Sequence, residues 1–127
     1  MRTLAREAVF KYLFSRLFNP SDEGLFDVLI KELNDDDKNF AKKILQTVID
    51  NELVYQEKLT ELVTRYKFER IFKADRLAIY IGMAEYDSYK DLTPKIVMID
   101  EAVKLSAKFS SENSPDFVNG VLGQYIK

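Results

Sequence analysis

Basic and aromatic side chains are the residues of this sequence with the clearest potential for chemistry. Arg2 and Arg6 stand one helical turn apart ahead of Phe10, and Phe117 follows the start of a C-terminal helix with free backbone N–H groups. Arginine pairs with phosphate, and an aromatic ring stacks on an unpaired base. These residues predict binding of an anion or of single-stranded RNA. The alternatives are solvated arginines at a helix start and a phenylalanine that only fills the core.

Side chains that catalyse reactions are scarce. The 127 residues include no His and no Cys, which removes imidazole bases, thiol nucleophiles and the commonest zinc ligands. The glycines at positions 24, 82, 120 and 123 match no phosphate-binding loop. The acidic run from Asp35 to Asp37 is more typical of a helix start than of a metal site. We therefore expect no enzyme, no cofactor and no metal.

Charge is unevenly distributed along the chain. The net charge is −2, but residues 1–20 and residues 65–76 each carry +3, whereas residues 21–64 carry −6. An RNA ligand would therefore have to select one basic face. The sequence contains no apolar run of about 18 residues and no signal-peptide pattern, so we expect a cytoplasmic protein without a membrane segment. Residues 1–127 have the length of one domain.

Apolar residues recur at helical spacing through most of the chain. The segments with this spacing are 3–18, 25–33, 35–49, 53–66, 77–85, 94–109 and 114–125. They predict an all-α protein, a compact bundle of about seven helices. The run from Leu77 to Ala84 is apolar on nearly every side, so it should lie at the centre with the first helix. The apolar arc of the first helix spans about 240°, and Arg2 and Arg6 on that arc should overhang the bundle.

Particular residues mark the helix starts and the packing positions. Thr93 and Ser114 each precede a proline, so each is expected to cap a helix whose first residue is that proline. Gly120 is expected to permit the close approach of another backbone. Glu85 ends the central apolar run as an isolated carboxylate. It is expected to reach the surface, to pair with a basic side chain or to serve a partner surface.

Two joined sequence motifs near the C-terminus are the most specific signal in the chain. The first is Asp100-Glu-Ala, and the second is Phe117-Val-Asn-Gly-Val-Leu. Ala5-Arg6-Glu7, the apolar run that ends in Glu85, and Pro94 accompany them. In these residues the chain resembles the NusB family of transcription antitermination factors.

The resemblance implies an all-helical RNA-binding factor that works with the ribosomal protein NusE. Such a factor holds boxA, a short single-stranded element of nascent ribosomal RNA transcripts, so that RNA polymerase reads through terminators. Matched position by position, Arg2, Arg6 and Phe117 are the implied RNA-binding residues, and we expect them to converge at one end of the bundle. Phe14 and Glu85 are the implied contacts with NusE. The free protein is expected to be a monomer or a homodimer.

The sequence departs from the family pattern at two places. Thr3 and Leu4 stand where relatives often have further arginines, and Asn113 stands where an acidic residue is common. Fewer arginines predict weaker RNA binding in the absence of NusE. Two other functions stay open. One is a protein-interaction module without RNA contact, and the other is a stand-alone relative of the NusB-like domain of some RNA cytosine methyltransferases.

Overall fold

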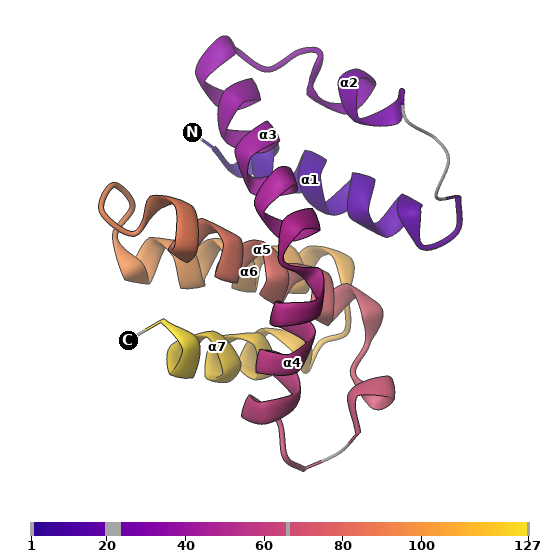
Figure 1. Ribbon diagram of the computed structural model, residues 1–127, viewed down its shortest axis with the longest axis vertical. Helices are drawn as coiled ribbons and strands as arrows, with labels where there is room; N and C mark the ends of the chain where they lie inside the picture. Colours follow the sequence, from indigo (N-terminus) through magenta and orange to yellow (C-terminus); the bar gives the residue numbers. More distant parts are fainter. Residues whose placement is uncertain (1, 20–23, 66, 127) are drawn as a thin grey trace.

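A computed structural model describes residues 2–19, 24–65 and 67–126, and this part of the chain is all-helical as expected (Figure 1). It contains seven α-helices and a short 3₁₀ turn, η1, at Phe68–Arg70. The α-helices are α1 (Thr3–Arg16), α2 (Leu25–Ile30), α3 (Asp35–Asp50), α4 (Glu52–Leu62), α5 (Lys73–Tyr89), α6 (Lys95–Phe109) and α7 (Ser114–Tyr125). Tyr66, the expected end of the fourth helix, lies outside the described residues.

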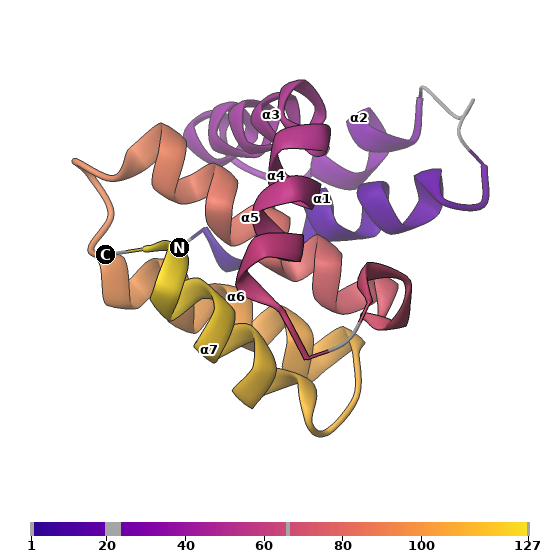
Figure 2. The same ribbon diagram turned by 60° about the horizontal axis from the view of Figure 1, so that its bottom comes forward.

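The central helix of the bundle is α5. It packs against α1 and α3 on one side and against α6 and α7 on the other, as Figure 2 shows from below. Every residue from Leu77 to Glu85 is buried, so the prediction of a buried central helix is confirmed. The apolar side chains of this run contribute to one core that draws on all seven helices.

The wide apolar arc of α1 is only partly covered by its neighbours. Val9, Phe10 and Leu13 are buried in the core. Phe14 and Leu17 remain exposed at the C-terminal end of the helix, because α2, α3, α5 and α6 leave that end partly uncovered. This exposed end agrees with the expectation that α1 has more apolar surface than a single neighbour covers.

The helix starts confirm one prediction and correct two. The side chain of Asn34 accepts a hydrogen bond from the backbone N–H of Asp37, so the acidic run does open a capped helix. The predicted caps Thr93 and Ser114 are wrong, because neither hydroxyl caps the helix that follows it. The Ser114 hydroxyl instead bonds to Ser110 and Ser111 in the preceding loop.

The close approach between α5 and α7 occurs at Gly82. A Cβ atom added at Gly82 would lie 2.6 Å from Cδ1 of Leu122, whereas a Cβ atom at Gly120 would meet no atom within 4 Å. The expectation for Gly120 is therefore wrong. The helical pattern identified a glycine on α7, but the glycine that the packing requires is on the central helix.

Candidate functional site

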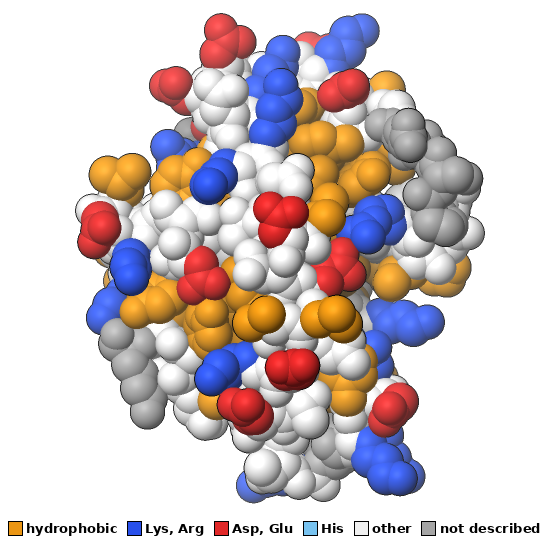
Figure 3. Space-filling view, viewed as in Figure 1, with side chains coloured by type: hydrophobic (Ala, Val, Ile, Leu, Met, Phe, Trp, Pro, Cys, Tyr) orange, Lys and Arg blue, Asp and Glu red, His pale blue; other side chains and the backbone are white. Residues whose placement is uncertain are grey.

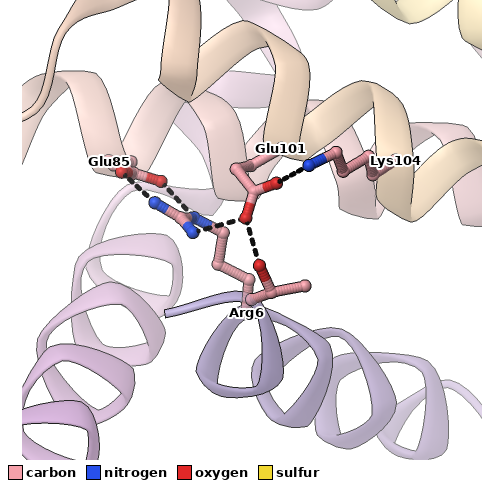
Figure 4. A network of polar contacts seen from close by, with 5 residues as sticks. Arg6, Glu85, Glu101 and Lys104 are labelled. Carbon is pink, nitrogen blue, oxygen red and sulfur yellow. Dashed lines mark hydrogen bonds and ion pairs between the residues drawn. The ribbon is translucent and has the colours of Figure 1, made fainter. Parts of the chain in front are cut away.

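Arg6 on α1 lies at the centre of a buried ionic network (Figure 4). Its Nε donates to Oε1 of Glu85 at 2.7 Å, and its Nη2 donates to Oε2 of the same carboxylate at 2.6 Å. Its Nη1 donates to Oε1 of Glu101 on α6 at 2.9 Å. The network therefore joins α1, α5 and α6 through one guanidinium.

This network corrects two structural expectations. Arg6 does not overhang the bundle, because it is only 5% exposed, and Glu85 is not an isolated carboxylate, because it is 1% exposed and held by Arg6 through two hydrogen bonds. The alternative in which Glu85 pairs with a basic side chain is the one observed. Both side chains are nearly enclosed, although Arg6 also lines the cavity that borders Arg2.

The second acid of the network, Glu101, is held by three groups. Besides Arg6, the Thr3 hydroxyl donates to its Oε1 at 2.6 Å, and the Lys104 ammonium lies 3.0 Å from its Oε2. Burial by itself would raise the pKa of Glu101, but the hydrogen bonds from Thr3 and Lys104 and the positive charge of Arg6 outweigh burial and lower it. Glu101 is thus ionised and holds the start of α1 against α6.

Arg2 lies beside this network but is half-buried rather than enclosed. Its guanidinium carbon is 4.5 Å from the ring centroid of Phe40 and 5.5 Å from that of Tyr89. No carboxylate in the described part of the chain forms an ion pair with it. Arg2 also lines an open cavity of about 460 Å³ together with Thr93 and Lys104. Its charge is therefore available to an anion at this surface.

Phe117 lies elsewhere, in the first turn and a half of α7. It is half-buried against the core and lines a cavity of about 160 Å³ with Arg70, Phe72 and Asp75. The cavity also borders Ser111, which follows the end of α6. Phe117 thus combines the two alternatives left open by the sequence, because part of its ring packs inward and part faces the cavity.

Asp75 is a buried carboxylate that the sequence analysis missed. It is 4% exposed, and its Oδ1 has no hydrogen-bond partner among the described residues. A buried acceptor without a partner is costly for the free protein. In the sequence, Asp75 was one of two acids within a basic segment, and nothing in its spacing distinguished it from a solvated acid.

Arg2 and Phe117 do not converge at one end of the bundle. Arg2 contacts Tyr89 at the end of α5, whereas Phe117 shares a cavity with Asp75 near the start of α5. Fourteen residues separate these two positions, which corresponds to about 21 Å at the rise of an α-helix. The expected convergence is therefore wrong, and a single ligand that touches both residues must be extended.

Two lysines on α6 lie in the interval between them. Lys104 and Lys108 are four residues apart on one helix face, and both side chains are more than half exposed. Lys108 forms an ion pair with Glu7 of α1 at 2.8 Å. Arg2, Lys104 and Lys108 therefore follow the seam between α1 and α6, and we call this row the cationic seam.

Phe14 belongs to a row of aromatic rings at the other end of the same two helices. Its ring lies 6.1 Å from that of Phe10 and 5.4 Å from that of Phe18, and Phe10 stacks on Phe109 of α6 at 4.6 Å. Phe14 is 38% exposed, and Phe18 is exposed further. We call these four rings the aromatic edge. It adjoins the Asp75 cavity through the segment from Phe109 to Ser111.

Across the described ranges, no helix is both long and apolar enough to cross a membrane.

Comparison with known proteins identifies the family. The sequence profile of the NusB family matches residues 2–127. The chain is 32% identical to the transcription antitermination protein NusB of Clostridium novyi, over 99% of this chain and 98% of that protein. It is also 32% identical to the protein of the same name from Alkaliphilus oremlandii, over 99% of this chain and 93% of the relative.

Solved structures give the same fold. NusB of T. maritima superposes with a TM-score of 0.87 at 24% identity, covering 98% of this chain and 89% of that one. A chain from a crystal structure of the antitermination factors NusB and NusE in complex with double-stranded RNA superposes with a TM-score of 0.77 at 24% identity, covering 97% and 93%. From the profile match over nearly its whole length and from these relatives, we conclude that the chain belongs to the NusB family.

Proposed function

We propose that residues 1–127 act as one RNA-binding domain of a transcription antitermination factor, which binds boxA RNA together with NusE and promotes read-through by RNA polymerase. The observation that carries the proposal is the cationic seam, which leads from Arg2 along α6 toward the cavity beside Phe117. Relatives that share nearly the full length of this chain are antitermination proteins. The role is one of binding, and it would be performed in the cytoplasm, where RNA polymerase works.

The proposed RNA path is a single extended strand. Phosphates would lie along Arg2, Lys104 and Lys108, and one unpaired base would stack on the exposed part of Phe117. The interval of about 21 Å corresponds to about six nucleotides at the rise of a stacked strand. The strand therefore has room for a short element such as boxA.

The proposed NusE surface is the aromatic edge together with the Asp75 cavity. Phe14 would contribute the apolar centre, and Asp75 would accept hydrogen bonds from a basic side chain of the partner. Arg6 and Glu85 are then positioning residues. Their pairing fixes the start of α1 against α5, and this in turn fixes Arg2 and the aromatic edge.

Acidic groups beside the cationic seam should weaken RNA binding in the absence of NusE. Glu7 and Glu101 partly neutralise Lys108 and Lys104, and the net charge of the chain is −2. RNA affinity of the chain alone should therefore be modest, because fewer counterions are released when phosphates meet partly neutralised cations. A basic partner that covers Asp75 removes a repulsive charge next to Phe117 and adds phosphate contacts of its own.

The test is a fluorescence-anisotropy titration of single-stranded boxA RNA, with and without NusE, at several salt concentrations. Lys104→Gln should lower the affinity and reduce the salt slope by about one. Lys58→Gln on α4 is the matched control, because it also removes an exposed lysine that pairs with a glutamate at helical spacing. Equal affinity for a scrambled RNA, for a duplex of the same sequence and for boxA would refute recognition of single-stranded boxA.

A protein-interaction module without RNA contact is the second candidate. The exposed aromatic edge favours it, because that surface needs a protein partner and no RNA. The same titration separates the two functions. NusE binding without any RNA binding, alone or in the mixture, would establish the second function and exclude the first.

A further inference from the structure

A groove on a different edge of α1 is used by neither of the proposed surfaces. It encloses about 290 Å³ between the end of α1, the junction of α3 with α4 and the start of α5. Its apolar lining consists of Leu13, Leu17, Val48, Leu53, Phe68 and Leu77. The cationic seam and the aromatic edge include none of these residues, so the groove is a separate feature.

Apolar surface continues out of the groove onto the exterior. Leu53 at the start of α4 is 75% exposed, and Leu17 after the end of α1 is 44% exposed. In Figure 3, hydrophobic side chains lie among Lys and Arg side chains on the right-hand side of the face that carries α3 and α4. Exposed leucines at the mouth of a groove are typical of a site that receives an apolar side chain.

The charges around the groove are mostly positive. Arg16 is neutralised by Glu52, at 2.9 Å, but neither Lys73 nor Arg76 forms an ion pair with any described carboxylate. Arg76 is held in place, because its Nη2 donates to the Phe68 carbonyl at 2.9 Å and its Nε to the Ile71 carbonyl at 3.0 Å. A fixed guanidinium whose charge is not neutralised suits a carboxylate ligand.

Tyr80 adds a polar group to the wall of the groove. It is 7% exposed, yet its hydroxyl has no hydrogen bond to any residue in the described ranges. Burial raises the pKa of this phenol to about 12, so it stays protonated and can donate. The groove thus combines an apolar floor with one hydroxyl donor and two cations.

We propose that this groove docks a short acidic peptide segment of a partner protein. An apolar side chain of the segment enters the cavity, and a neighbouring carboxylate faces Lys73, Arg76 and the Tyr80 hydroxyl. The volume lies near the lower limit for small-molecule pockets and suits one or two side chains. The complementary charge would come from the acid, since the groove offers three cations against one carboxylate.

Other occupants fit the groove less well. A nucleic-acid strand would match the cations, but it has no aliphatic group for the leucine lining, and Arg76 already covers the Phe68 ring at 4.0 Å. A second copy of this chain could offer the acidic run Asp35 to Asp37. The next apolar residue of that run, Phe40, is buried in its own core, so it cannot enter a neighbour's groove.

The experiment is an NMR titration of the full chain with three synthetic helical peptides. The first carries Glu beside Leu at helical spacing, the second replaces Glu with Lys, and the third replaces Leu with Ser. We expect saturable binding of the first peptide alone, with a Kd below about 1 mM. The largest shifts should map to Leu13, Leu17 and Leu53. The proposal stands apart from RNA and NusE binding, so the failure of either one does not decide the other.

Variants locate the site and its chemistry. Lys73→Glu and Leu53→Ser should each lower the affinity for the Glu-Leu peptide at least tenfold. Tyr80→Phe should lower this affinity about threefold, because one hydrogen-bond donor is lost. Lys58→Glu, on the exposed part of α4, is the control and should change nothing. Thermal melts show whether each variant is folded.

Four results would overturn the proposal. They are no saturation by the first peptide, equal binding of the Lys peptide, shifts that map outside the groove, and full affinity in folded Lys73→Glu. Groove shifts that depend on protein concentration without any peptide would assign the groove to a second copy, and groove shifts with single-stranded RNA would assign it to nucleic acid.

Discussion

Buried carboxylates at the two ends of the seam between α1 and α6 differ in their hydrogen-bond partners. At the start of α1, Glu85 and Glu101 are buried, and both bond to Arg6. The second oxygen of Glu101, Oε2, has only the Lys104 ammonium as a partner, at 3.0 Å. Near the far end, Asp75 is buried to a similar degree, but its Oδ1 has no hydrogen-bond partner among the described residues. The first arrangement completes the fold from within, whereas the second leaves a polar requirement that a ligand can meet.

Partner recognition in this protein is expected at the end of the seam where a carboxylate lacks a partner. A buried carboxylate that is fully paired stabilises one arrangement of helices and has nothing left to offer. An unpaired one next to exposed rings lowers the stability of the free protein and gains a partner on binding. Variants at the two ends of the seam separate these two roles.

The largest effect is expected from breaking the paired end. Glu85→Ala leaves Arg6 with one of its three hydrogen bonds and removes one of the two carboxylates that neutralise it, so it should lower the free energy of unfolding by about 3 to 5 kcal/mol. Chemical denaturation measures this loss. Glu57→Ala, at an exposed position of α4, is the matched control and should stay within about 0.5 kcal/mol of wild type. Wild-type stability combined with lost NusE binding would instead return Glu85 to a partner surface.

At the unpaired end, Asp75→Asn should act on binding and spare the fold. The substitution keeps the shape and removes a buried charge without a partner, so the melting temperature should stay unchanged or rise. Affinity for NusE, measured by calorimetry, should fall by about 2 to 5 kcal/mol because the partner's cation loses its acceptor. A lower melting temperature with normal NusE affinity would show that Asp75 is structural after all.

A smaller loss is expected at the base-stacking position. Phe117→Ala should cost about 1 to 3 kcal/mol of boxA affinity in the presence of NusE. Some stability will also be lost, since part of the ring packs on the core. Phe117→Leu separates the two effects, because it retains apolar packing and lacks an aromatic face. Full RNA affinity in Phe117→Leu would exclude stacking.

The smallest effect concerns pH and the Glu101 end of the network. The pKa of Glu101 is lowered from its ordinary value of 4.5, so its contribution to stability is complete above pH 4.5 and is lost as the pH falls through the lowered value. Thr3→Val removes one of the bonds responsible. Thermal melts between neutral pH and about pH 3 should then show the acid-induced loss at a higher pH than in wild type. Identical pH profiles would contradict this role of Thr3.

Much of the fold was predictable from apolar spacing. The seven helices and the buried central run followed from periodicity, because core burial imposes that spacing directly. The caps at Thr93 and Ser114 were not predicted correctly. The Ser114 hydroxyl bonds to Ser110 and Ser111 instead, and α6 begins one residue later than expected, at Lys95, without a side-chain cap. The close approach at Gly82 was missed since it depends on where Leu122 of another helix falls.

The site was only partly predictable, because its geometry depends on contacts between helices that are distant in the sequence. The sequence did contain a signal for the Arg6–Glu85 pair, because Arg6 lies on the apolar arc of α1 and Glu85 ends an apolar run. Opposite charges on two central helices are expected to pair when both are buried. Asp75 carried no such signal, because its isolation depends on how the loop before α7 covers it.

The most direct test of the central claim, that one RNA strand runs from Arg2 to Phe117, is the boxA affinity measured against RNA length in the presence of NusE. We predict that affinity rises until the RNA reaches about six nucleotides and then levels off. Arg2→Glu should abolish the gain in affinity that nucleotides at one end of the RNA provide. Phe117→Ala should abolish the gain that nucleotides at the other end provide. Affinity that is complete with two or three nucleotides, or variants that affect the same short fragment equally, would contradict the extended path.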